Sequence, residues 1–116
     1  MKKLIYGSIP PRSEELNSGK IRILLNYVEI TRTDYEHDES GNIVGDPIEI
    51  TEYEVTYVDV DNVDYESIVE GLIRQKYSIS NEFAILRQAS TKIEDFEEYN
   101  TYAEICKTLA KQWLQK

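Results

Sequence analysis

The chain has 116 residues and a formal net charge of −9 at pH 7, with 41% hydrophobic residues, nine tyrosines and a single cysteine. This length suits one domain, residues 1–116, and excludes two independent cores. The acidic balance argues against nucleic-acid binding, the lone cysteine excludes an intrachain disulfide framework, and no apolar run is long enough to span a membrane. We therefore expect a protein of the cytoplasm or of a virion, with neither nucleic acid nor membrane as partner.

Residues 1–62 have the pattern of strands, and one long hairpin dominates them. Residues 4–6 predict a short strand, Pro10 and Pro11 interrupt regular pairing, and residues 13–19 resemble a polar surface loop. Between residues 20 and 62, two strand-like runs flank Gly41-Asn42, a dipeptide typical of a two-residue type II′ turn. This turn predicts a register in which paired residue numbers sum to 83: Ile23 opposite Val60, Leu25 opposite Val58, Val28 opposite Val55 and Ile30 opposite Tyr53.

Both strands of this hairpin change the phase of their apolar residues near the middle. The first has apolar residues at odd positions up to Leu25 and at even positions from Val28, and the second changes between Val55 and Val58. Because side chains alternate between the faces of a strand, each change moves the apolar side to the other face. A strong twist, a β-bulge, or burial of the two halves by different neighbours each explains this pattern.

Residues 63–116 form the helical half, in which the sequence predicts three helices. Asp64 is placed to cap the first, the second is expected over residues 81–88, and the third begins at the capping box of Thr91 and Glu94 and continues almost to Lys116. The fold class is therefore α+β: a long antiparallel β-hairpin, with a short N-terminal strand, followed by three C-terminal α-helices. Helical spacing predicts a core that includes Ile68, Val69, Leu72, Ile73, Phe83, Leu86, Phe96 and Ala103.

The residues that most often carry chemistry do not form a recognisable site. His37 is the only histidine and lies near the hairpin tip, so we interpret it as a solvated turn residue rather than a metal ligand. Asp59, Asp61 and Asp64 are spaced like part of a calcium loop, but the EF-hand pattern fails, and a strand end followed by a helix cap explains them better. Cys106 lies mid-helix and is expected to be a buried small hydrophobe. We expect a non-enzymatic protein with no catalytic residues, cofactor or metal.

The predicted third helix carries a stripe with the spacing of a coiled-coil seam. Its members alternate at intervals of three and four over about two and a half heptads: Phe96, Tyr99, Ala103, Cys106, Ala110 and Trp113. One interpretation is that the stripe packs on the protein's own sheet or first helix. The other is an oligomer interface formed by Phe96, Tyr99, Ala103, Ala110 and Trp113, which would make the protein a homo-oligomer.

Several strings in the sequence resemble small proteins from prophages of gut bacteria, which have no assigned activity. The strings are residues 9–14 (IPPRSE), the hairpin tip at residues 38–42 (DESGN), residues 73–78 (IRQKYS), residues 82–88 (EFAILRQ) and residues 97–100 (EEYN). The resemblance covers most of the chain and carries over no catalytic residues. It implies a role in a virion or in tail morphogenesis.

We therefore expect a structural or interaction protein of phage origin, with other proteins as its partners. The alternative, based on the net charge of −9, is an acidic inhibitor that mimics nucleic acid and masks a host DNA-binding enzyme. Such a mimic predicts carboxylates in two rows on one face, spaced like phosphates.

Overall fold

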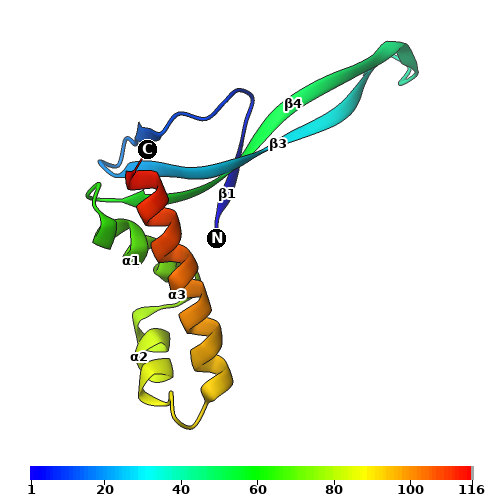
Figure 1. The fold of residues 1–116 in the computed structure, drawn as a ribbon. Coiled ribbons are helices and arrows are strands. Elements are labelled where there is room, and N and C mark those ends of the chain that lie inside the picture. Colours follow the sequence, from blue (N-terminus) through cyan, green and yellow to red (C-terminus); the bar gives the residue numbers. More distant parts are fainter. Residues whose placement is uncertain (116) are drawn as a thin grey trace.

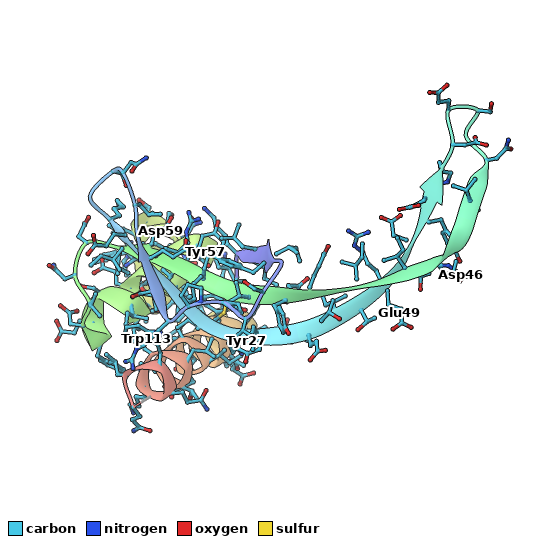
Figure 2. The ribbon with its side chains drawn as sticks, turned by 90° about the horizontal axis from the view of Figure 1, so that it is seen from above. Tyr27, Asp46, Glu49, Tyr57, Asp59 and Trp113 are labelled. Atoms are coloured by element: carbon cyan, nitrogen blue, oxygen red, sulfur yellow. The ribbon has the colours of Figure 1, made fainter. Side chains whose placement is uncertain are left out.

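A computed structural model describes residues 1–115 and confirms the α+β class (Figure 1). A compact head contains the three helices and one end of the sheet, and the long hairpin extends beyond it (Figure 2). The strands are β1 (Lys3–Tyr6), β2 (Ser13–Glu15), β3 (Ile21–His37) and β4 (Ile43–Val60), and the helices are α1 (Tyr65–Lys76), α2 (Ile79–Arg87) and α3 (Ile93–Leu114).

The strands form one antiparallel sheet in the order β1-β4-β3-β2. The prediction of a loop over residues 13–19 is wrong at its start, because β2 pairs with β3 at Ser13–Glu15. Strands of three residues have too little periodicity to be recognised in a sequence. Since β1 and β2 lie on opposite edges, residues 7–12 must cross from one edge of the hairpin to the other.

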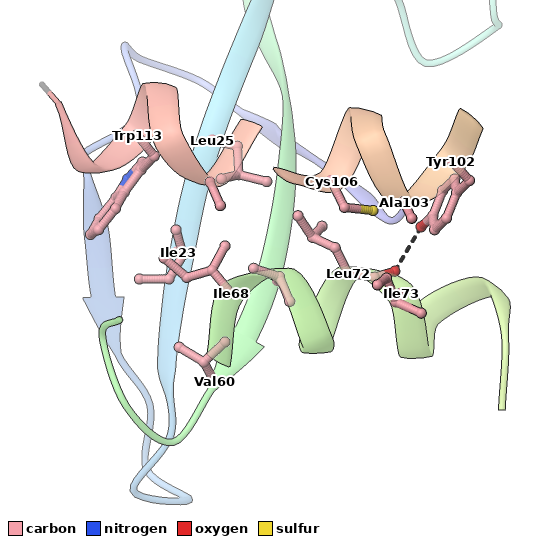
Figure 3. Close-up of a cluster of buried hydrophobic side chains, with 12 residues drawn as sticks. Ile23, Leu25, Val60, Ile68, Leu72, Ile73, Tyr102, Ala103, Cys106 and Trp113 are labelled. Atoms are coloured by element: carbon pink, nitrogen blue, oxygen red, sulfur yellow. Dashed lines mark hydrogen bonds between the residues drawn. The ribbon is translucent and has the colours of Figure 1, made fainter. Parts of the chain in front are cut away.

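Helices α1 and α3 cover one face of the sheet, and the main core lies between these layers (Figure 3). Asp64 caps α1 as predicted, since its carboxylate accepts a hydrogen bond from the Ser67 backbone N–H. The Tyr102 hydroxyl donates to the Leu72 carbonyl at 2.7 Å, so α3 is also tied to α1 by a buried polar contact. The buried cluster comprises Ile23, Leu25, Val58, Val60, Ile68, Leu72, Ile73, Tyr102, Ala103, Cys106, Ala110 and Trp113.

A smaller buried group lies on the face opposite the helices. Leu24 and Val55 are only 3% and 1% exposed, although neither belongs to the main core cluster. They point away from Ile23 and Val58, because neighbouring residues of a strand face opposite sides. Residues 7–12 cross the hairpin on this side, away from the helices (Figure 1). The two halves of β4 are therefore buried by different neighbours, which explains the phase change between Val55 and Val58.

The predicted hairpin register is wrong by two residues in the head. Ile23 pairs with Val58 rather than Val60, and beyond the head Val28 pairs with Glu54 and Ile30 with Glu52. Leu25 and Asn26 together oppose Thr56 in a β-bulge. This bulge explains the phase change on β3, as one of the sequence interpretations proposed.

The hairpin turn also differs from the prediction. Gly41 lies in the turn, but Asn42 does not, since its carbonyl accepts a hydrogen bond from the Asp38 backbone N–H at 2.9 Å. The loop is Glu39-Ser40-Gly41, and Gly41 has the positive φ of 85° that follows a type I turn in three-residue hairpin loops. Gly41 therefore occupies the last loop position rather than the first of a type II′ turn.

Two of the helical predictions are wrong. Lys92 precedes α3 and makes no side-chain cap, while the Thr91 hydroxyl donates to the Gln88 carbonyl, so the capping box of Thr91 and Glu94 does not form. Phe83 and Leu86 lie on α2 and are 62% and 50% exposed, because α2 contacts α3 through its other side. Val69 and Phe96 are partly buried, and the remaining predicted core residues are buried.

Candidate functional site

The most distinctive surface of the molecule is the part of the hairpin outside the head, residues 27–54, which we call the arm. None of its residues is buried, and only Ile30, Ile50, Glu52, Tyr53 and Glu54 are even partly covered. The arm gives the molecule extents of 62 × 31 × 26 Å. The arm is thus a projecting ribbon with almost no contact to the rest of the chain.

The arm carries nearly all of the net charge. It contains nine acidic residues and one basic residue, Arg32, so its net charge is −8. The remaining residues include 13 acidic and 12 basic side chains, which leaves a net charge of −1. Charge is therefore segregated between a nearly neutral head and a strongly acidic arm.

Few of these carboxylates are neutralised within the chain. Arg32 binds Glu52 at 2.9 Å and lies 3.6 Å from Asp34, and Lys3 of β1 lies 3.3 Å from Glu54. The other six carboxylates have no ion pair with any residue among 1–115: Glu29, Glu36, Asp38, Glu39, Asp46 and Glu49. The arm therefore presents a negative potential that is free to attract a cationic partner.

Hydrogen bonds between the Asp38 side chain and the backbone of the turn hold the tip of the hairpin in shape. The Asp38 carboxylate accepts hydrogen bonds from the backbone N–H groups of Asn42 and Ser40, each at 2.9 Å. These bonds, the Asn42 contact above all, lower the pKa of Asp38 below its ordinary value, because they favour the charged form. His37 is the last residue of β3, pairs with Ile43 and is exposed.

Both faces of the arm combine acidic with apolar residues. The register puts Tyr27, Glu29, Tyr53 and Glu49 on the helix-free face, and Tyr27 contacts Tyr53 edge to face at 5.6 Å between ring centroids. The opposite face carries Glu52, Glu54 and Asp34 together with four β-branched side chains: Val28, Ile30, Ile48 and Ile50. Such a surface can provide both charge steering and apolar contact.

The residues that the sequence singled out lie elsewhere, in structural roles. Asp59 pairs with Arg22 through two hydrogen bonds of 2.8 and 3.1 Å, and Asp64 caps α1, so these acids do not converge on a cation. Burial raises the pKa of the Cys106 thiol, which keeps it in the unreactive protonated form. Within residues 1–115, no group of three or more His, Cys, Asp or Glu side chains is arranged to hold a metal ion.

The heptad-spaced residues of α3 are used mainly inside the chain. Ala103, Ala110 and Trp113 are buried in the main core, and Phe96 and Tyr99 are partly buried. Trp113 is also held by Arg12, whose guanidinium stacks 4.2 Å from the ring centroid and donates to the Trp113 carbonyl, while the indole N–H donates to the Arg12 carbonyl. Ala103, Ala110 and Trp113 of this stripe therefore pack inside the chain's own core.

One hollow in the head lies between the end of α1, α2 and the start of α3. It has a volume of about 350 Å³ and is open to solvent. Its wall carries the charged residues Lys76, Lys92, Asp95 and Glu98, and Lys76 binds Glu98 at 3.3 Å. Its walls bring together no nucleophile with a base. The arm therefore remains the stronger candidate for function.

Sequence reasoning found the hairpin and its acidity but not the arm as a separate unit. The bulge at Leu25 and Asn26, which marks where the arm leaves the head, was visible only as a phase change. The charge of the arm could have been found by counting residues 27–54 alone.

Comparison with protein-family models, curated proteins and solved structures yields no match to this chain. None of the helices within residues 1–115 is both long and apolar enough to cross a membrane.

Proposed function

We propose that this chain is a non-enzymatic interaction protein whose head anchors an acidic arm that binds a basic surface on another protein. The observation that carries the proposal is the segregation of charge: the arm has a net charge of −8 and buries none of its residues. A two-stranded ribbon of this length contributes little to its own stability. A ribbon that adds little stability and lies outside the core is best explained by contacts with a partner.

The resemblance to prophage proteins adds a setting to this proposal. A virion or tail component binds neighbouring subunits, and a projecting hairpin can reach a neighbour while the head packs elsewhere. Electrostatic complementarity would speed such assembly and select against wrong partners. We therefore propose a role in the assembly of phage particles.

Deletion of the arm provides the test. A variant in which residues 31–51 are replaced by Asn-Gly retains the pair Ile30–Glu52 and all of β1 pairing. Partners captured by the immobilised wild type from a phage-producing host should be lost by this variant, and a purified partner should bind the wild type more weakly as salt rises. Equal capture by both proteins would disprove the role of the arm.

A matched pair of charge variants separates charge from shape. Three carboxylates of the arm and three exposed ones of the head are neutralised in turn: Glu36→Gln, Asp46→Asn and Glu49→Gln in one variant, and Glu15→Gln, Glu66→Gln and Glu97→Gln in the other. Both triple variants carry the same net charge. Only the arm variant should lose affinity and show a weaker salt dependence.

The nucleic-acid mimic receives less support from this geometry. Its carboxylates should form two rows on one face, whereas Glu29 and Glu49 lie on one face of the arm and Asp34, Glu52 and Glu54 on the other. A mimic would be displaced from its target by DNA. Displacement of the captured partner by duplex DNA would favour the mimic over an assembly protein.

Self-association is a second candidate, favoured by the apolar stripe on α2. Ile79, Phe83 and Leu86 are 65%, 62% and 50% exposed, and their spacing is nearly symmetric about Phe83. Two antiparallel copies of α2 would therefore place Phe83 against its equivalent, as a two-fold interface requires. Light scattering should give a mass above 13.5 kDa at high concentration, reduced by Phe83→Ser. A mass of 13.5 kDa at every concentration would exclude it.

A further inference from the structure

The two long edges of the arm differ in their capacity to accept another strand. On the β3 side, β2 pairs only at residues 21–23, and no strand within residues 1–115 covers β3 from Tyr27 to His37. On the β4 side, β1 covers Tyr53–Thr56. No strand within residues 1–115 pairs with the outer edge of residues 43–52. Each free edge leaves backbone N–H and C=O groups without a ladder partner.

The β4 edge of the arm is interrupted near the tip, whereas the β3 edge is regular from Tyr27 to Asp34. Gly45, Asp46 and Pro47 together oppose the single residue Tyr35, Gly45 has a φ of 77°, and Pro47 has no N–H to donate. Bulges and prolines are the devices by which proteins prevent strand addition at an edge. The β4 edge is therefore blocked near the tip.

By contrast, β3 offers an unbroken ladder. The register between Tyr27 and Asp34 is constant, so the strand is regular over this stretch. It contains no proline or glycine and is rich in β-branched residues, namely Val28, Ile30, Thr31 and Thr33. An extended segment could hydrogen-bond along it without disturbing the β3–β4 pairing.

Charge identifies the occupant of this edge. A second copy of the arm would place two ribbons of charge −8 at a strand spacing of about 4.8 Å. That spacing is shorter than the screening length of about 8 Å at physiological ionic strength, so repulsion would oppose pairing of arm with arm. A segment with lysine or arginine at alternate positions would instead meet Glu29 on one face or Asp34 on the other.

We infer that the outer edge of β3 over residues 27–34 receives an extended, basic strand of a partner protein, which adds to the sheet in line with β2. The inference rests on the proposed function and specifies its binding mode. Backbone hydrogen bonds would supply the affinity, and the acidic side chains would select a cationic sequence. The bulge at Gly45–Pro47 would oppose addition on the β4 side near the tip.

The probe is a soluble peptide of alternating lysine and valine, long enough to span residues 27–34. A peptide with the same number of lysines but with proline in place of valine serves as control. It keeps the charge but loses every second backbone N–H, and its prolines disfavour regular strand pairing. Binding is followed by fluorescence anisotropy, and amide hydrogen exchange is measured residue by residue with and without peptide. The triple variant Glu36→Gln, Asp46→Asn, Glu49→Gln reports the contribution of charge.

The expected result is that the lysine–valine peptide binds severalfold more tightly than its proline control, with affinity that falls as salt rises. At saturation it should slow exchange of alternate amides within residues 27–34 and leave residues 43–47 unchanged. The triple variant should bind more weakly but show the same protection pattern at saturation.

The outcomes separate this inference from the proposed function. Equal, salt-sensitive binding of both peptides, without protection of β3, would overturn strand addition while retaining the arm as an electrostatic binding element. Protection of the β4 edge instead would also overturn it. If neither peptide binds, both the binding mode and the proposed acidic binding role of the arm fail.

Discussion

Gly71 shows how a single residue sets the distance between two layers of the head. A Cβ at this position would lie 2.7 Å from Cγ2 of Val58 and 3.4 Å from Cγ1 of Val60. Val58 is buried, so it has little room to move. Helix α1 can therefore approach β4 closely only because residue 71 has no side chain.

Replacement of this glycine should consequently destabilise the protein, although alanine is the better helix former. Gly71→Ala gains about 1 kcal/mol in helix propensity but overpacks the core, at a cost of about 1–3 kcal/mol. We expect a net loss in the free energy of unfolding, measured by denaturant titration. Glu70→Ala, at the exposed neighbouring position, should change stability by less than about 0.5 kcal/mol. Gly71→Ala as stable as the wild type would contradict the close contact.

Glu82 is the residue that holds α2 to the other two helices. Its carboxylate accepts hydrogen bonds from the Tyr99 hydroxyl of α3 and from Arg74 of α1, the latter at 2.9 Å. These contacts, Tyr99 first, lower the pKa of Glu82. Burial, followed by the bond to Glu82, raises the pKa of Tyr99 to about 12.

Glu82→Gln should therefore lower the pKa of Tyr99 toward its ordinary value of 10.0, because an amide does not repel the phenolate as a carboxylate does. Ultraviolet titration of the tyrosines measures this shift, and Tyr99→Phe assigns the step to Tyr99. Glu97→Gln, which changes an exposed carboxylate on α3, is the control and should leave the step in place. An unchanged step in Glu82→Gln would show that Glu82 does not contact Tyr99 in solution.

At the level of elements, apolar spacing predicted the helices better than it predicted which side of each helix is covered. On α1 the stripe of Ile68, Leu72 and Ile73 is buried, as expected. The similar stripe on α2 faces solvent, because α2 lies at the edge of the head. Periodicity identifies an apolar face, but only the arrangement of the other elements decides what covers it.

Leu72→Ala and Phe83→Ala should separate these two cases. Leu72 is fully buried, so its truncation should reduce the free energy of unfolding by about 2–5 kcal/mol. Phe83→Ala removes a larger side chain but should cost less than about 1 kcal/mol, since most of that side chain is already exposed to water. Denaturant unfolding at low protein concentration gives both values. Similar losses for the two variants would mean that the Phe83 side chain is buried in solution.

The hairpin illustrates why register was harder to predict than the existence of the strands. The residues around Gly41 suit both a two-residue and a three-residue loop, and the two choices shift every pair. Two bulges then change the register again. The phase change between Leu25 and Val28 marks the first, but the apolar pattern does not mark the second. In the head the apolar pattern is satisfied in both registers, because Ile23 meets a valine in each. The sheet edges, and hence the site of the inferred strand addition, depended on these details.

For the whole molecule, several tyrosines with raised pKa values couple stability to alkaline pH. The pKa of Tyr6 is raised to about 12 by burial and by its bond to Glu14, and that of Tyr99 is raised to about 12. The folded state therefore holds these protons more tightly than the unfolded chain, in which the pKa is near 10.0. Their contribution is complete below pH 10 and is lost as the pH rises through about 12.

The free energy of unfolding should consequently fall across this pH interval. Denaturant unfolding at successive alkaline pH values provides the measurement. Tyr6→Phe cannot ionise at this position, so its stability should fall less steeply than that of the wild type over the same interval. Parallel curves for the two proteins would show that Tyr6 ionises equally easily in the folded and unfolded states.

Because the arm projects from the head, the molecule should be elongated in solution. The radius of gyration over Cα atoms is 19.5 Å, whereas a compact chain of this length would have about 13 Å. Small-angle X-ray scattering should give a value close to the larger figure, and replacement of residues 31–51 by Asn-Gly should reduce it toward the compact one. Because the arm buries nothing in the head, the same variant should keep the thermal stability of the wild type. A compact radius for the wild type would mean that the arm folds onto the head, which would remove the free β3 edge on which strand addition depends.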